Sequence, residues 1–141
     1  MNLEKLCIQV QTLVHSTGEM ILNERKSFDR SQVEIKGLHD YVTHIDKLAE
    51  ENLVAGLEIL IPESGFIAEE GTSTKKGENY NWIIDPIDGT TNFIHGIPAF
   101  SISIALTENE KLVMGVVYEI SGDEMFYAWK GSPAYLNGKE I

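Results

Sequence analysis

Cysteine and basic residues are scarce in this sequence. Its single cysteine, Cys7, excludes an intramolecular disulfide and is typical of a reducing compartment. Lys and Arg together number 11 against 22 Asp and Glu, which gives a formal net charge of −11 at pH 7. We therefore expect no nucleic acid among the partners, because binding a polyanion requires clustered basic side chains.

A long apolar run is also missing. No stretch approaches the roughly 18 apolar residues of a membrane span. Charged and polar residues interrupt the apolar positions of residues 1–20, which is not the pattern of a signal peptide. We therefore expect a cytoplasmic protein that does not contact a membrane. The 141 residues and the hydrophobic share of 43% are typical of one ordinary globular domain.

Two amphipathic helices are expected in the first half of the chain. Apolar residues recur at three- and four-residue steps over residues 3–21, and again over residues 42–60. Pro62 stops the second helix. Residues 27–40, between the two, lose this period and are interpreted as a loop or a short strand.

Strands are expected in the rest of the chain. A short one is predicted at residues 66–70. The later candidates lie at residues 80–85, 99–106, 111–120, 124–130 and 133–141. Asn137-Gly138 is a strong hairpin signal, yet only three residues follow it. We therefore interpret residues 1–141 as the N-terminal portion of a longer, apparently truncated protein with an α+β fold, two helices followed by a mainly antiparallel sheet.

The stretch "WIIDPIDGTTNF" at residues 82–93 places two carboxylates at the end of an apolar strand. Pro86 is expected to stop that strand, so the turn after it can bring Asp85 and Asp88 to one place. Two carboxylates that close repel each other unless a proton or a cation lies between them. The spacing therefore indicates a cation site.

The same stretch resembles the beginning of a helix. Asp88 can cap this helix, Gly89 allows close approach, and the free backbone N–H groups of such an end bind anions, phosphate above all. A cation site beside an anion site is what metal-assisted phosphoryl transfer requires.

A second acidic pair, Glu69-Glu70, also follows an apolar strand. An all-oxygen ligand set without a His or Cys cluster favours Mg²⁺ over zinc. Two ions about 4 Å apart could then share Asp85. The plainer interpretations stay open: Asp-Pro-x-Asp-Gly is a common turn, the glutamate pair can be a solvated strand end, and Lys75-Lys76 is expected to lie in a solvated loop.

Three segments of the chain together resemble a known family: "KGLHDYVTHID" at residues 36–46, "FIAEEG" at 66–71 and "WIIDPIDGTTNFIHGIPAFSISIAL" at 82–106. They are similar to the inositol monophosphatase family of magnesium-dependent, lithium-sensitive phosphatases, and the resemblance extends over nearly the whole chain. It implies a layered α/β sandwich of the sugar-phosphatase type and a homodimer.

The resemblance also implies the metal ligands. Glu69, Asp85 and the backbone carbonyl of Ile87 would bind a first Mg²⁺ ion. Asp85 and Asp88 would bind a second, and Glu69 would help to hold a weaker third ion through water.

The resemblance further implies how phosphate and water are held. Thr90, oriented by Asp46, would position the attacking water, so that Glu69, Thr90 and Asp46 form the catalytic set. Asp88, Gly89 and Thr90 would lie at the phosphate, with the last two offering backbone N–H groups. The family mechanism uses metal-activated water and no phosphoenzyme.

The expected reaction is hydrolysis of a phosphate monoester of a small polyol, such as inositol 1-phosphate. The alternatives are fructose 1,6-bisphosphatase activity, 3′-phosphoadenosine nucleotidase activity, or a non-catalytic regulatory protein with the same fold. Members of the family continue into a C-terminal half that supplies another aspartate to the second metal and most substrate contacts. Without that half, we expect residues 1–141 to bind the second metal weakly and to show little or no turnover.

Overall fold

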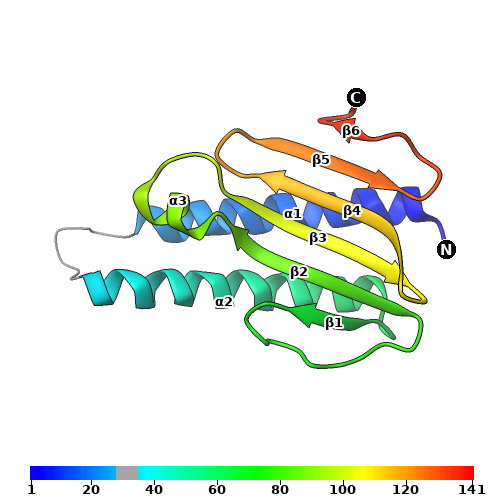
Figure 1. The fold of residues 1–141 in the computed structure, drawn as a ribbon, viewed down its shortest axis with the longest axis horizontal. Coiled ribbons are helices and arrows are strands. Elements are labelled where there is room, and N and C mark those ends of the chain that lie inside the picture. The colour runs from blue at the N-terminus through cyan, green and yellow to red at the C-terminus, as the bar shows by residue number, and fades with distance from the viewer. Residues whose placement is uncertain (28–34) are drawn as a thin grey trace.

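The computed structural model describes residues 1–27 and 35–141 and shows two long helices followed by a sheet (Figure 1). The helices are α1 (Leu3–Lys26), α2 (Ile35–Leu60) and the short α3 (Thr90–His95). The strands are β1 (Gly65–Ala68), β2 (Tyr80–Asp88), β3 (Ser101–Glu108), β4 (Lys111–Glu119), β5 (Glu124–Trp129), β6 (Tyr135–Leu136) and β7 (Lys139–Glu140).

Both long helices form where the apolar period predicts them. Asn2 caps α1, because its side chain accepts a hydrogen bond from the backbone N–H of Lys5 at 3.0 Å. The interpretation of residues 27–40 is wrong in part: α2 begins at Ile35, and residues 28–34 lie outside the described residues. Once the packed part of α2 is helical, extending it toward the N-terminus adds one hydrogen bond per residue without a new nucleus. No helix in the described ranges has the length and apolar character that crossing a membrane requires.

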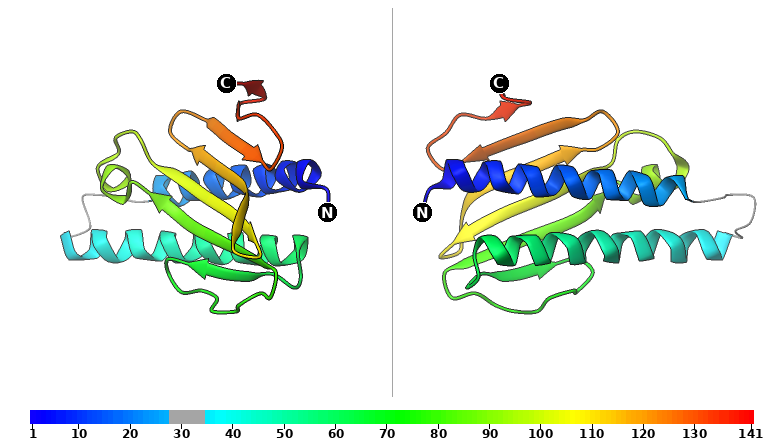
Figure 2. Two further views of the ribbon diagram at one scale, coloured as in Figure 1. Left: turned by 45° about the vertical axis from the view of Figure 1, so that its right-hand side comes forward. Right: turned by 180° about the vertical axis from the view of Figure 1, so that it is seen from behind.

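The strands form one sheet in the order β1-β2-β3-β4-β5-β6-β7. Only the β1–β2 pair among these is parallel, and every other neighbouring pair is antiparallel. Both long helices lie on one face of this sheet, as the view from behind shows (Figure 2). Their apolar stripes pack against the inward-facing strand residues, and Trp82, Ile102, Leu106, Ile45 and Leu53 are completely buried there. The predicted α+β fold with a mainly antiparallel sheet is confirmed.

Strand β2 does not stop at Pro86, as the sequence predicted, but runs on to Asp88. Its register with β3 shifts within this stretch: Asp85 pairs with Ser103, and Asp88 pairs with Ser101. Two residues of β2 therefore face one residue of β3, which is the geometry of a β-bulge. A proline has no N–H for the ladder and is accepted at a bulge, so it distorts this strand instead of ending it.

The predicted hairpin at Asn137-Gly138 is present. Strand β6 turns into β7 through two residues with positive φ, 49° at Asn137 and 84° at Gly138. Such a turn requires left-handed backbone at both central positions, which explains the Asn-Gly sequence. Asn137 also fixes the hairpin to β5, because its side-chain oxygen accepts a hydrogen bond from the N–H of Met125 at 2.8 Å.

Candidate metal and phosphate site

Acidic side chains from α2, β1 and β2 gather at one end of the sheet. Strands β1 and β2 run parallel with Ala68 beside Ile84, so the residues that follow them in sequence, Glu69 and Asp85, come out next to each other. Helix α2 crosses behind this end and adds acidic residues of its own. We call this group the acidic cluster; it consists of Asp46, Glu50, Glu69, Glu70, Asp85 and Asp88.

Asp46 is a member of the acidic cluster whose pKa responds to four of the other carboxylates. It lies on α2 and its residue is only 8% exposed. Burial first, and then neighbouring negative charge, raise its pKa from 3.8 to about 7. The neighbouring charges are those of Glu70, Glu69, Asp85 and Glu50. The structure thus brings Asp46 close to the acidic residues at the ends of β1 and β2.

Asp85 lies at the centre of the acidic cluster, at the start of the bulge in β2. Burial first, then the hydrogen bond and charge of Glu69 and the charge of Asp88, together raise its pKa from 3.8 to about 7, although the backbone N–H of Ile87 acts to lower it. Its Oδ1 atom is buried and has no hydrogen-bond partner in the described part of the chain. A buried acceptor without a donor is uncommon in a folded protein and points to a missing proton, water or ion.

Glu50 was not predicted as a site residue, although it is completely buried in the same cluster. Its Oε1 accepts a hydrogen bond from the N–H of Glu70 at 2.9 Å. Its Oε2 accepts from the N–H of Thr72 at 3.1 Å and from the Thr72 hydroxyl at 2.5 Å. The available sequence signal was its position four residues after Asp46, which places both on one side of α2.

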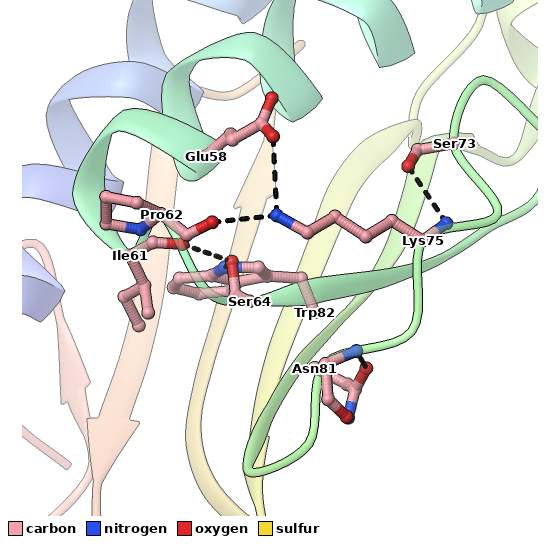
Figure 3. A network of polar contacts seen from close by, with 9 residues as sticks. Glu58, Ile61, Pro62, Ser64, Ser73, Lys75, Asn81 and Trp82 are labelled. Carbon is pink, nitrogen blue, oxygen red and sulfur yellow. Dashed lines mark hydrogen bonds and ion pairs between the residues drawn. The ribbon is translucent and has the colours of Figure 1, made fainter.

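The loop that follows Glu70 is fixed by polar contacts at its far end (Figure 3). Lys75 Nζ donates to the carbonyl of Pro62 at 2.7 Å and lies 3.5 Å from Oε1 of Glu58. The Asn81 side chain accepts from the N–H of Gly77 at 2.9 Å and donates to its carbonyl at 3.1 Å. Lys75 and Lys76 are exposed and lie in a loop, as expected, and the Lys75 ammonium group in addition ties this loop to the end of α2.

Helix α3 begins directly after Asp88, as the sequence predicted, but its N-cap residue is Gly89 and not Asp88. No side chain caps this helix; the Gly89 carbonyl accepts the first backbone bond, from Phe93 N–H at 3.0 Å. Gly89 has φ of 89°, and a Cβ atom there would lie 2.6 Å from the carbonyl oxygen of Ala99. Only glycine fits this close approach to the Ala99 carbonyl, so the path of the chain itself requires Gly89.

Thr90 and Ile87 lie together at the start of α3. The Thr90 hydroxyl donates to the Ile87 carbonyl oxygen at 3.1 Å. No hydrogen bond joins Thr90 to Asp46 among residues 1–27 and 35–141, so their joint role in orienting water stays a prediction. A carbonyl oxygen has two lone pairs, so the hydrogen bond from Thr90 does not by itself prevent the Ile87 oxygen from accepting a second partner.

The donor set of the acidic cluster fits a hard cation in its chemistry. It supplies carboxylate and carbonyl oxygens and no His or Cys, which is the ligand type that Mg²⁺ prefers. The buried Asp85 Oδ1 atom, without a donor, is the observation that favours a cation here. Within the described ranges, however, no group of three or more His, Cys, Asp or Glu residues is already arranged to hold a metal ion. The side chains would have to converge further around one.

A cavity of about 300 Å³ opens beside Asp85, on the sheet face that carries the exposed side chains of Ile67 and Ile83. Glu69 and Asp85 are among its lining residues, together with apolar and small residues of β1, β2 and β3. The carboxylates are thus reachable from this face. The cavity gives room for a small anionic group next to the candidate cation ligands.

Comparison with known proteins identifies the family of this chain. The model of the inositol monophosphatase family matches residues 2–141. The chain belongs to the inositol monophosphatase family. The fold described above is therefore that of a phosphatase family.

Two relatives and one solved structure show how much of the family protein is present. An inositol monophosphatase of Dictyostelium discoideum is 42% identical over 132 residues, which cover 92% of this chain and 48% of that protein. A fructose-1,6-bisphosphatase/inositol-1-monophosphatase of Aquifex aeolicus is 34% identical over 141 residues, 99% of this chain and 53% of that protein. The crystal structure of the extragenic suppressor protein suhB from Bartonella henselae matches with a TM-score of 0.83 and 35% identity, over 97% of this chain and 54% of that one. The chain thus spans about half the length of the relatives it matches.

Proposed function

We propose that residues 1–141 are the N-terminal, metal-binding portion of a magnesium-dependent phosphomonoesterase. The proposed substrate is the phosphate monoester of a small polyol, of the inositol 1-phosphate type. The observation that carries this proposal is the buried, donor-free Oδ1 atom of Asp85 inside a cluster of carboxylates, in a chain of this phosphatase family.

In this proposal the chain's own oxygens hold the metal. Glu69, Asp85 and the Ile87 carbonyl bind one Mg²⁺, and Asp85 with Asp88 binds a second, with a weaker third ion near Glu69. Bound Mg²⁺ would lower the pKa of water and offset the negative charge of the phosphate.

The remaining site residues act on the phosphate and the water. The backbone N–H groups of Gly89 and Thr90 are proposed to hold phosphate oxygens beside Asp88. Asp46, whose pKa is raised to about 7, is proposed to orient Thr90 and, through it, the attacking water. No Ser or Cys nucleophile is needed in this scheme.

Complete activity is proposed to require more than these residues. Because the chain spans about half of its relatives, the contacts to the alcohol part of the substrate and a further metal ligand are assigned to chain outside residues 1–141. We further propose a cytoplasmic homodimer that lithium inhibits.

A second candidate substrate is fructose 1,6-bisphosphate. The Aquifex aeolicus relative is named for both activities, and its match covers 99% of this chain. Both substrates are phosphate esters of small polyols, so the residues described here would treat their phosphate in the same way. The choice between them depends on contacts to the polyol.

The proposal is tested by titrating the purified 141-residue chain with Mn²⁺, observed by electron paramagnetic resonance, beside its Asp85→Asn variant. The exposed Glu51 on α2 supplies the control, Glu51→Gln. We expect saturable Mn²⁺ binding that Asp85→Asn weakens at least tenfold and Glu51→Gln leaves unchanged. Absence of Mn²⁺ binding, or binding that Asp85→Asn does not alter, would contradict the proposal.

Phosphate release is measured on the same three proteins with inositol 1-phosphate and with fructose 1,6-bisphosphate. We expect little or no turnover from residues 1–141 with either substrate. Turnover at the level of a full-length relative would refute the assignment of further contacts to chain outside these residues.

A further inference from the structure

Glu50 is a buried carboxylate without a role in the proposed mechanism. It is completely buried on the sheet-facing side of α2, yet within residues 1–27 and 35–141 its hydrogen bonds go to one short turn 20 to 22 residues further along the chain. Glu70 N–H, Thr72 N–H and the Thr72 hydroxyl all donate to it. Hydrogen bonds to an ionised acceptor are about twice as strong as neutral ones.

We infer that Glu50 is a positioning residue for Glu69: it clamps the turn at residues 69–72 so that the Glu69 carboxylate stays beside Asp85. The consequence for metal binding rests on the proposed function, whereas the clamp itself rests on the hydrogen bonds alone. Glu50 acts on Glu69 through the backbone. It accepts hydrogen bonds from the next residue, Glu70, and from Thr72, and these bonds hold the segment that carries Glu69.

The strand pairing by itself holds Glu69 weakly. The Glu69 N–H reaches the Ile84 carbonyl at 3.4 Å, which is long for a hydrogen bond, and this residue already lies past the last β1–β2 pair. The Glu70 N–H, one residue later, is 2.9 Å from Glu50. The firm contact of this segment is therefore with the helix and not with the sheet.

The backbone conformation of the turn directs two of its N–H groups, those of Glu70 and Thr72, to Glu50 on the helix. Gly71 takes a left-handed conformation, with φ of 72°, and its N–H donates to the Ala68 carbonyl at 3.1 Å. The N–H groups on either side of Gly71, those of Glu70 and Thr72, are the ones that Glu50 accepts. A single carboxylate with two oxygens can serve both at once, which a hydroxyl or an amide oxygen cannot do in the same way.

Glu50 is better suited to positioning than to binding a cation. Two carboxylate oxygens offer about four lone-pair sites, and three are taken by donors of the turn. Asp85 shows the opposite state, with a buried oxygen that no donor reaches in the described ranges. The acidic cluster thus contains one carboxylate, Glu50, that binds backbone N–H groups, and another, Asp85, with an oxygen that no donor reaches in the described residues.

The test uses the 141-residue chain with Glu50→Gln, Thr72→Val and Thr72→Ser, and Glu51→Gln as the matched control on the adjacent, exposed helix position. Glutamine keeps the length of the side chain but replaces one acceptor oxygen by an NH₂ group. Valine removes the Thr72 hydroxyl at similar volume, and serine restores it. Three quantities are measured: amide hydrogen exchange at Glu70 and Thr72, Mn²⁺ affinity, and the urea midpoint.

We expect Glu50→Gln to speed amide exchange at Glu70 and Thr72 and to lower Mn²⁺ affinity by about 10-fold to 100-fold, the usual effect of losing a residue that orients a metal ligand. Thr72→Val should lower the affinity by a smaller factor, and Thr72→Ser should retain the wild-type value. A merely structural role would shift the urea midpoint without the serine rescue of Mn²⁺ affinity.

Two results would overturn the inference. One is amide exchange at Glu70 and Thr72 that stays as slow in Glu50→Gln as in the wild type. The other is faster exchange with unchanged Mn²⁺ affinity. If Glu50→Gln fails to fold, Thr72→Val against Thr72→Ser decides the matter. If the wild-type chain binds no Mn²⁺, the proposed function fails, and amide exchange alone still decides whether Glu50 clamps the turn.

Discussion

The helix side of the acidic cluster, around Glu50, and its sheet side, around Asp85, treat a buried carboxylate in opposite ways. On the helix side, Glu50 accepts three hydrogen bonds from Glu70 and Thr72, in the turn that follows β1. On the sheet side, the bulge at Pro86 shifts the strand register and leaves Oδ1 of Asp85 buried without a donor among the described residues. The two carboxylates have the same chemistry, so the backbone around them decides what each can do.

The difference has an energetic meaning. Glu50 is completely buried, so its oxygens have lost their water, and each hydrogen bond that replaces it contributes about 0.5–1.5 kcal/mol. Glu50 therefore stabilises the fold through the donors it satisfies. Asp85 satisfies no donor with Oδ1 and sits among like charges, so in the metal-free chain it opposes folding. One side of the cluster contributes stability, and the other holds an open acceptor for a ligand.

Of the changes considered, Glu50→Ala is expected to have the largest effect on stability. This change leaves the N–H groups of Glu70 and Thr72 without their acceptor and creates a cavity beside α2, so we expect a loss of about 3 kcal/mol in the free energy of unfolding. Urea denaturation followed by circular dichroism measures it. Glu51→Ala, on an exposed position of the same helix, should change the stability by less than about 0.5 kcal/mol. A loss below about 1 kcal/mol at Glu50 would show that the hydrogen bonds to the turn are energetically idle.

Asp85→Asn should act with the opposite sign. It removes a negative charge from a crowded cluster and supplies an NH₂ group, so we expect the metal-free chain to become more stable by about 1 kcal/mol. The matched change, Asp88→Asn, falls on an exposed residue of the same bulge and should have an effect nearer zero. Urea denaturation at pH 8 with a chelator present measures both. A destabilised Asp85→Asn variant would mean that Asp85 is a structural carboxylate like Glu50.

The sequence predicted the helix cores and the hairpin, because the apolar period and the Asn-Gly turn are local signals. It did not predict the outcome at Pro86, since a proline fits either the end of a strand or a bulge. Which of the two occurs depends on pairing with β3, a strand more than ten residues away.

Glu50 escaped prediction for a related reason. Its three donors come from residues 20 and 22 positions further along the chain, and nothing in the local pattern of α2 separates it from a solvated glutamate. The Asp46 and Glu50 spacing of four indicated a shared helix side but not that this side faces a turn with free N–H groups. The donor-free Oδ1 atom of Asp85 is likewise a property of the packed molecule.

The smallest effect on stability is expected at Lys75. Like Glu50, it holds the loop after β1, but from a half-exposed position. Its side chain is 43% exposed, and its ion pair with Glu58 at 3.5 Å is screened by solvent. The hydrogen bond to the Pro62 carbonyl at 2.7 Å is the stronger contact. Lys75→Met keeps the aliphatic stem, and we expect it to cost about 0.5 kcal/mol, with Lys76→Met as the control for the loss of one positive charge.

Salt separates the two contacts of Lys75. The ion pair with Glu58 weakens at 1 M NaCl, where the Debye length falls to about 3 Å, whereas the hydrogen bond to the Pro62 carbonyl persists. We therefore expect most of the difference between Lys75→Met and Lys76→Met, measured by urea denaturation, to remain at 1 M NaCl. If it vanishes, the loop is held by charge alone on this side, and the buried Glu50 clamp is then the contact that sets the position of residues 69–72.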